Sequence, residues 1–321
     1  MEFVHKPVLY DEVIRLMHIR PDGVYMDGTL VGGGHAKGIA ESLSSEGKLI
    51  GIDRDEEALK AAGERLKPYR DRTMLYHANF GEYGRVLGEA GITRVDGILL
   101  DLGVSSYQID NPERGFSYMH DAPLDMRMDR SRGETAADLL NHADVDTITE
   151  ILRVYGEERF ARQIAMRIAS VRETSPVRTT GELVSIIEKT IPRRFRENGG
   201  HAAKRTFQAL RIAVNDELSG LSDTLSGMID HLTDGGRIAV ITFHSLEDRI
   251  VKTAFHTAED PCICPPDFPV CTCGRKSKGI VVTRKPVTAS EEELADNSRA
   301  KSAKLRVFER HYLEAERTGE P

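Results

Sequence analysis

The 321-residue sequence lacks several features that would have indicated its class at once. No apolar run approaches the length of a membrane span, and the N-terminal region does not resemble a signal peptide, so we expect a cytoplasmic protein with no membrane partner. Only four cysteines are present, all between Cys262 and Cys273, which argues against a disulfide framework across the fold. Excess positive charge is also missing. The formal net charge of −7 argues against a protein that coats nucleic acid through bulk charge.

Local charge differs from this average. Basic side chains dominate the stretches 193–211, 275–285 and 299–310, and each stretch contains one acidic residue at most. Any one of them is compatible with an ordinary solvated face. Three such stretches in an acidic chain favour an anionic partner, because local patches set the field that a phosphate experiences.

A glycine-rich turn follows a short apolar run near the N-terminus. The run ends at Asp27, glycines follow at positions 28, 32, 33 and 34, and 36–40 is typical of the start of a helix. Strand, glycine turn and helix together open a nucleotide-binding βαβ unit. A second apolar run ends at Asp53, 20 residues after Gly33, which is the usual interval to a carboxylate that binds a ribose hydroxyl.

The glycine spacing also bears on which ligand is bound. A dinucleotide site requires G-x-G-x-x-G, which no window of this turn provides, and Asp27 would repel a phosphate. S-adenosylmethionine (SAM) has no phosphate and carries a sulfonium and an ammonium group, so an acid before the turn suits it. We therefore predict SAM as the cofactor. A nicotinamide-dependent oxidoreductase and a non-catalytic binding protein on the same scaffold remain as alternatives.

Further apolar runs over 73–80, 95–103 and 237–243 alternate with helical patterns, which predicts a doubly wound, mostly parallel sheet. Ligands bind such sheets at the carboxyl ends of the strands, where Asp27, Asp53, Phe80 and Asp101 are expected. The runs 279–287 and 303–311 are candidates for a closing antiparallel pair. Seven strands in this arrangement match class I SAM-dependent methyltransferases.

A long segment interrupts this alternation. Residues 111–213 carry helical patterns, including helices that start near Thr147 and Thr179, and no convincing strand. A single long apolar stripe over 207–232, kinked at Ser219-Gly220 and ended by Gly235-Gly236, is expected to return the chain to the sheet. We predict a discontinuous methyltransferase domain, 1–110 and 214–321, with an inserted helical substrate domain.

Several long strings carry a close family resemblance. The sequence resembles RsmH, formerly MraW, a bacterial family of 16S rRNA methyltransferases, from His5 to Arg306, in the strings 27–29, 33–35, 96–106, 114–117, 123–129, 205–211 and 243–249. The resemblance implies SAM-dependent methylation of the exocyclic N4 amine of one cytidine in the decoding region of 16S rRNA. It also implies that the partner is this rRNA within the assembling small subunit.

Site residues follow from the same resemblance. It implies that Gly33, Gly34 and His35 wrap the SAM, that Asp53 holds the ribose and Phe80 flanks the adenine, and that Asp101 and Gln108 line the pocket. Asp101 is the best single candidate for a catalytic carboxylate. His35 contributes either its side chain or only its backbone N–H at a helix start.

Other residues leave two interpretations open. Asp125, Arg127 and Asp129 form either a salt-bridged loop or part of the substrate side, and His244 either caps a helix or touches RNA. Arg194 and Arg205 are candidates for phosphate contacts. No metal is expected at the active site.

The four cysteines lie in a loop that contains Pro261, Pro265, Pro266 and Pro269. Their C-x-C pairs suggest a zinc site, but zinc motifs more often use C-x₂-C, and a one-residue spacer constrains tetrahedral ligation. A reduced, metal-free loop that helps contact RNA is the favoured interpretation.

Overall fold

The computed structural model describes residues 7–196, 201–265 and 270–312. His5, Pro266 and Pro269, which were named above, lie outside these residues, as do 197–200 of the first basic stretch. The chain divides into two compact units, one formed by Met1–Gly103 with Ser219–Pro321 and the other by Val104–Leu218. The predicted insertion, 111–213, falls inside the second unit.

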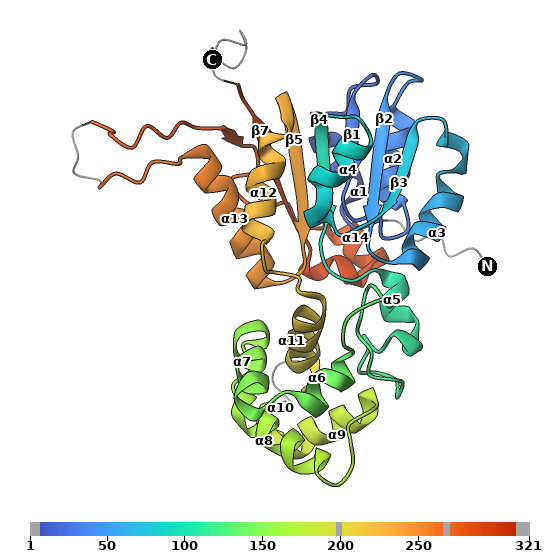
Figure 1. Cartoon of the computed structure of the whole chain (residues 1–321), viewed down its shortest axis with the longest axis vertical. Coiled ribbons are helices and arrows are strands. Elements are labelled where there is room, and N and C mark those ends of the chain that lie inside the picture. Colours follow the sequence, from blue (N-terminus) through green and yellow to red (C-terminus); the bar gives the residue numbers. More distant parts are fainter. Residues whose placement is uncertain (1–6, 197–200, 266–269, 313–321) are drawn as a thin grey trace. The chain divides into compact units, whose positions relative to one another are not determined.

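The first unit is built on one seven-stranded sheet (Figure 1). Its strands lie in the order β3-β2-β1-β4-β5-β7-β6, and β7 is antiparallel to both of its neighbours while the pairs from β3 to β5 are parallel. The strands are β1 (Val24–Asp27), β2 (Lys48–Asp53), β3 (Thr73–His77), β4 (Val95–Asp101), β5 (Leu232–Thr242), β6 (Gly279–Val281) and β7 (Lys304–Arg310). This topology confirms the predicted class I methyltransferase fold, including the antiparallel pair.

Helices cover both faces of this sheet, which explains why its central strands are apolar on both sides. One face carries α1 (Tyr10–Met17), α2 (Gly34–Ser42), α3 (Glu56–Arg65) and α14 (Glu291–Asp296), whose side chains pack in one cluster with Tyr25, Leu49 and Leu99. The other face carries α4 (Tyr83–Glu89), α12 (Leu221–Asp230) and α13 (Ser245–Glu259) (Figure 1). The core therefore lies on both sides of the sheet, and each fully buried leucine or isoleucine contributes about 1.5–3 kcal/mol.

The apolar stripe predicted over 207–232 differs from the structure in where its helices break and end. The chain forms two helices, α11 (Lys204–Asn215) and α12, because Asp216 adopts a left-handed conformation with φ 48° and Gly220 does so with φ 69°. Gly235 and Gly236 do not end the helix, which stops at Asp230. They lie inside β5, beside a register shift between Val95 and Gly97 of β4.

The second unit is helical and has its own apolar core, which includes Leu152, Ile164, Leu183 and Leu210. Its helices are α5 (Ser106–Asp110), α6 (Ala136–His142), α7 (Val145–Gly156), α8 (Ala161–Arg172), α9 (Thr180–Thr190), α10 (Arg193–Arg196) and α11. The predicted helix start near Thr179 is confirmed at α9, where Thr179 and Glu182 form a capping box. The helix predicted to start near Thr147 is α7, but Asp144 caps it, so a capping box at Thr147 is wrong.

The described residues of the second unit contain no strand beyond an isolated bridge between Pro123 and Thr179. No helix in the described part of the chain is both long enough and apolar enough to cross a bilayer.

Candidate active site

Three carboxylates lie at the carboxyl ends of adjacent parallel strands. β1 is paired with β2 on one side and β4 on the other. Asp27 lies opposite Gly51 and Leu99, so Asp53 and Asp101 end the neighbouring strands two residues further along. Asp27 is 1% exposed, and burial raises its pKa well above the usual value, with further contributions from the charges of Asp101 and Asp53. A site that concentrates negative charge in this way favours a cationic ligand over a phosphate.

Asp53 is fixed by the backbone of the turn that it faces. Its two carboxylate oxygens accept hydrogen bonds from the N–H groups of Val31 and Asp55, both at 2.9 Å. Burial raises the pKa of this carboxyl, and the two backbone donors partly offset the effect. A carboxylate has about four acceptor sites, so two remain for other donors such as ribose hydroxyls.

The glycine turn is tightly wound against α3 and β2. Val31 has φ 57° and Gly33 has φ 76°, both in the left-handed region. That region is unusual for a β-branched residue such as Val31. A Cβ at Gly33 would lie 3.1 Å from the Ala62 Cα, so this position also has no room for a side chain. Phe80 follows β3 and starts a short 3₁₀ helix, and its Cβ would lie 3.2 Å from a Cβ added at Gly28.

Asp101 ends β4 with an oxygen that lacks a partner. Within the described residues its buried Oδ1 accepts no hydrogen bond, and its side chain is 13% exposed. Burial, together with the nearby Glu247 carboxylate, raises the pKa of Asp101 to about 7. An unsatisfied buried acceptor is costly, and it suits a ligand that brings a donor or a positive charge.

His35 lies at the start of α2 with its side chain directed inward. Its Nε2 lies 3.0 Å from the Val8 carbonyl oxygen, and its Nδ1 lies 3.6 Å from Asp101 Oδ2. Burial lowers the pKa of the ring to about 4, so His35 is neutral. Because a carbonyl can only accept a hydrogen bond, Nε2 carries the hydrogen and donates it to the Val8 carbonyl. The side chain therefore links the N-terminal segment to the neighbourhood of Asp101. A contact between this side chain and SAM remains a prediction.

Gln108 is the predicted pocket residue that belongs to the second unit. It is 4% exposed, and it forms a capping box with Ser105 at the start of α5. Reasoning from strand ends missed it because it follows no strand. Its S-x-x-Q spacing is a sequence signal only for the cap.

The residues with open interpretations make internal contacts. Asp125 binds the Arg127 guanidinium with distances of 2.8 and 3.1 Å, and Asp129 pairs with Arg132 at 2.8 Å, as in the salt-bridged loop. His244 caps α13 in a capping box with Glu247.

The third basic stretch, 299–310, is mostly structural. Lys304 and Arg306 pair with Asp248, and Arg310 is 5% exposed and donates to the Lys278 carbonyl. It therefore does not form the solvated basic face that its sequence suggests. By contrast, Arg193, Arg194, Lys204 and Arg205 of the first stretch are exposed.

Comparison with known proteins agrees with this geometry. A model of the MraW methylase family matches residues 2–311. The ribosomal RNA small subunit methyltransferase H 2 of Agathobacter rectalis is 56% identical over 98% of this chain and 100% of its own length. The ribosomal RNA small subunit methyltransferases H of Lachnospira eligens and Heliobacterium modesticaldum are 54% and 53% identical over 97% of this chain, and over 98% and 99% of their own lengths. The chain therefore belongs to the MraW methylase family of SAM-dependent methyltransferases.

Proposed function

We propose that this protein transfers the methyl group of SAM to the exocyclic N4 amine of one cytidine in the decoding region of 16S rRNA. The observation that carries the proposal is the row of carboxylates at the ends of β1, β2 and β4 around a glycine turn. The names of the relatives, which are small-subunit rRNA methyltransferases, support the RNA substrate. The cytidine and its N4 atom come from the resemblance of the sequence strings.

The donor would lie along this edge. Gly34 and His35 offer backbone N–H groups in the first turn of α2, where Gly33 is the N-cap residue and donates its own N–H to the Leu30 carbonyl. Asp53 retains acceptor capacity for the ribose hydroxyls. Phe80, beside Gly28, supplies an aromatic face for the adenine. Asp101, whose Oδ1 has no partner among the described residues, accepts from the donor or from the target amine. The family resemblance adds Gln108 of the second unit to the residues that bind SAM.

Little covalent chemistry is required of the protein. The amine nitrogen attacks the methyl carbon in line with the sulfur, the C–S bond breaks, and the products are S-adenosylhomocysteine, the N4-methylated base and one proton released to water. The amine lone pair is delocalised into the ring, so a well-placed acceptor such as Asp101 helps to orient the N–H groups. Positioning and exclusion of water account for the rate.

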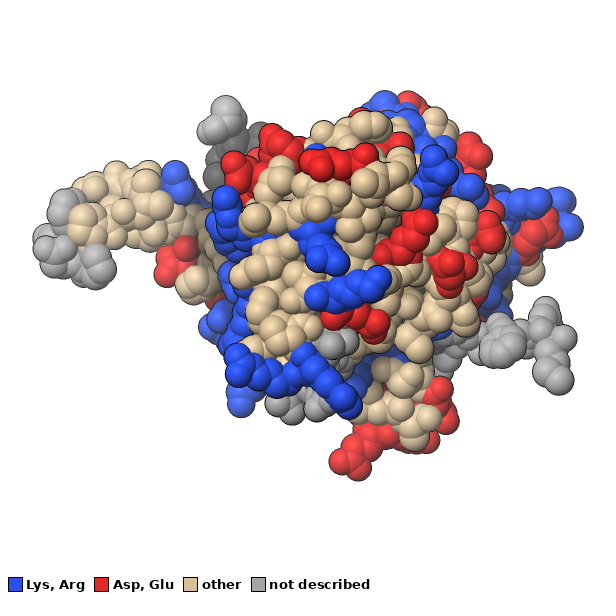
Figure 2. All heavy atoms as spheres, turned by 90° about the horizontal axis from the view of Figure 1, so that it is seen from below, with Lys and Arg blue, Asp and Glu red and all other residues tan. Residues whose placement is uncertain are grey.

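The second unit offers the chemistry of an RNA contact. The Arg194 guanidinium lies 4.8 Å from the centre of the Phe195 ring, which is 45% exposed and packs on Phe160 with ring centres 5.4 Å apart. Arginine beside an exposed aromatic ring suits phosphates and unstacked bases. On the face shown in Figure 2, Lys and Arg side chains gather along one edge and are interspersed with acids elsewhere. We propose that this unit helps to hold the RNA while the target cytidine is turned out of its stack.

Two experiments test the proposal. Mass-spectrometric mapping of small-subunit rRNA from cells with and without this protein should show the loss of one N4-methylated cytidine, and a variant Asp53→Ala should fail to restore it. Retention of the modification in the deleted strain would reject the assignment. A protein that binds ribosomes without catalysis would fail to bind SAM in a calorimetric titration.

The RNA surface has its own test. Arg194→Gln with Arg205→Gln should weaken binding to small-subunit particles and reduce the salt slope of log K by about 1.5, since each lost phosphate contact removes about 0.7–0.9. Arg85→Gln is the matched control, because Arg85 is held between Glu82 and Glu89 on α4. An unchanged slope in the double variant would place the RNA elsewhere. An rRNA substrate would also place the protein in the cytoplasm.

A further inference from the structure

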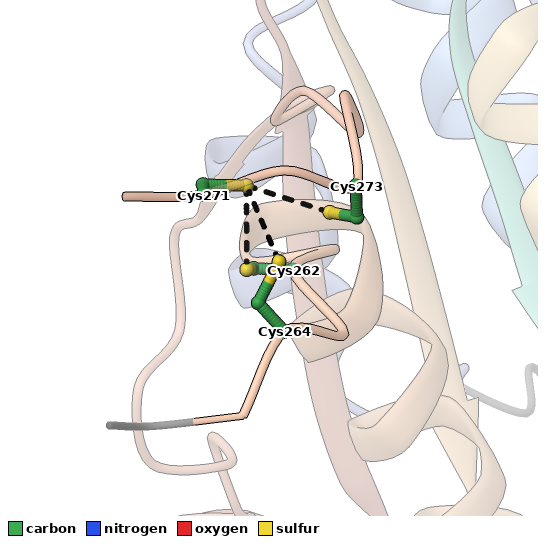
Figure 3. Close-up of side chains that lie close together, drawn as sticks. All are labelled: Cys262, Cys264, Cys271 and Cys273. Carbon is green, nitrogen blue, oxygen red and sulfur yellow. Dashed lines mark hydrogen bonds between the residues drawn. The ribbon is translucent and has the colours of Figure 1, made fainter. Parts of the chain in front are cut away.

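The connection from α13 to β6 brings four sulfur atoms together. The Cys271 Sγ lies 3.6 Å from that of Cys262, 3.9 Å from that of Cys264 and 3.5 Å from that of Cys273 (Figure 3). All four sulfurs lie within 4.8 Å of one another. The two C-x-C pairs, separated in sequence, thus converge on one small volume.

These separations match those of a metal tetrathiolate. Four sulfurs at the usual Zn–S distance of about 2.3 Å occupy the corners of a tetrahedron with edges of about 3.8 Å. The three measured separations, 3.5–3.9 Å, are close to that edge. The one-residue spacer, which counted against zinc in the sequence, is no obstacle here, because Cys271 and Cys273 reach the required separation across Thr272.

The backbone around the cluster offers a hydrogen-bond donor to sulfur. The N–H of Thr272 donates to the Cys264 Sγ at 3.3 Å. A backbone donor of this kind suits the charged thiolate form in which cysteine binds a metal ion.

The loop has little else to hold it in place. Its apolar side chains Ile263 and Val270 are 65% and 69% exposed, so they contribute no core. The described residues between Asp260 and Lys278 belong to no helix or strand, and the base of the loop is tied by the bond from the Lys278 N–H to the Ala258 carbonyl. Small segments without a core generally need a cross-link to adopt one structure.

We propose that Cys262, Cys264, Cys271 and Cys273 bind one zinc ion as a closed, structural tetrathiolate site. Binding replaces the thiol protons: one Zn²⁺ and four thiols give a zinc tetrathiolate of charge −2 and four protons, fewer by one for each sulfur that is already a thiolate. The exposed Arg275 and Lys276, which follow the last ligand, lie where they offset this charge. The site is closed, so its role is to fix the loop, and it takes no part in methyl transfer.

The test uses the untagged full-length chain, purified under reducing conditions without chelator. Elemental analysis should find about one zinc per chain and no stoichiometric iron, and native mass spectrometry should show the matching adduct. The double variant Cys262→Ser/Cys271→Ser should contain at least about tenfold less zinc per chain than the parent, because two of the four ligands are gone. Ile263→Ser is the control, since it alters an exposed residue of the same loop and leaves every sulfur in place.

Two further measurements separate the alternatives. Cobalt(II) added to the metal-free chain should give the visible spectrum of a tetrahedral thiolate complex, and zinc should displace it. Trypsin should cut after Arg275 and Lys276 in the metal-free chain and more slowly in the zinc-loaded chain. SAM binding measured on the double variant should be unchanged, so failure here and failure of the methyltransferase proposal are distinguishable.

Three results would overturn the zinc assignment. Four freely titratable thiols in the purified, metal-replete chain would show that no metal is bound. A mass lower by two or four hydrogens, restored by reductant, would show disulfides instead. Stoichiometric iron in place of zinc would show a different metal.

Discussion

Asp101 is the residue at which stability and donor binding are expected to oppose each other most clearly. We consider Asp101→Asn, which keeps the size of the side chain and removes its charge. In the folded protein the pKa of Asp101 is about 7, against 3.8 for a free aspartate, because the carboxyl is buried. At a pH between these two pKa values, Asp101 is ionised in the unfolded chain and protonated in the folded chain. Folding is therefore opposed increasingly as the pH rises from about 4 to 7.

The size of this effect follows from the shift. At about 1.36 kcal/mol per pKa unit, ionisation of Asp101 costs the donor-free protein about 4 kcal/mol at pH 8 and about 1.5 kcal/mol at pH 5. Asparagine does not ionise and escapes this cost at both values. The gain in stability of Asp101→Asn over the parent should therefore be larger at pH 8 than at pH 5 by about 2.5 kcal/mol.

Urea denaturation followed by circular dichroism at both pH values measures this difference. Asp71→Asn is the matched control, because the Asp71 side chain is 61% exposed and undergoes the same chemical change on the surface. Calorimetric titration of SAM should show weaker binding to Asp101→Asn, although that variant is the more stable protein. The reasoning fails if the gain over the parent is the same at pH 5 and pH 8, or if the variant binds SAM as tightly as the parent does.

Three other predictions concern the donor site and the second unit. SAM affinity should rise about tenfold from pH 6 to pH 8, because the ionised fraction of a group with a pKa of about 7 rises by that factor and the donor is cationic; a flat titration profile would exclude Asp101 as the binding carboxylate. Gly33→Ala should destabilise the protein by about 1–2 kcal/mol in thermal unfolding and abolish SAM binding, since its φ of 76° is left-handed. The control Gly88→Ala in α4 has open space around it and should stabilise the protein by up to about 1 kcal/mol in the same assay. Asn215→Ala should cost about 2–4 kcal/mol, because its side chain bonds the buried backbone at Met126 and Met128 at 2.7 Å each and both partners would be left unsatisfied; a change below 0.5 kcal/mol would contradict this account.

The strand-end acids could be predicted from sequence because their pattern is local. An apolar run that ends in Asp27, Asp53 or Asp101 indicates a buried strand, and parallel pairing brings such ends to one edge. The structure confirms those strands and their order. What each acid binds is still a prediction, because the sequence carries no direct record of a ligand.

The sequence predictions were wrong where the backbone conformation of one or two residues decides whether a helix or a strand continues. Asp216 and Gly220 break the stripe over 207–232 through their backbone conformation, although the apolar spacing continues across them. Gly235 and Gly236 resemble a helix stop, but Leu232 and Arg237 pair with β4 on either side of them, so both glycines lie within the strand at a register shift. The two C-x-C pairs suggested a shared site in the sequence, but the approach of all four sulfurs to within 4.8 Å of one another is visible only in the structure.

If SAM binds at the sheet edge as proposed, the acids there would let the site distinguish the donor from its product. Asp27 and Asp101 are buried near each other, and the pKa of each is raised, so the donor-free protein pays for their charge and a cation lowers that cost. SAM carries a sulfonium charge that S-adenosylhomocysteine lacks. At the proposed site the same carboxylates would hold the donor more tightly than the product. Because the sulfonium charge fades as the methyl group moves, these acids would favour donor binding and product release. The rate of the chemical step would then come from alignment of the amine.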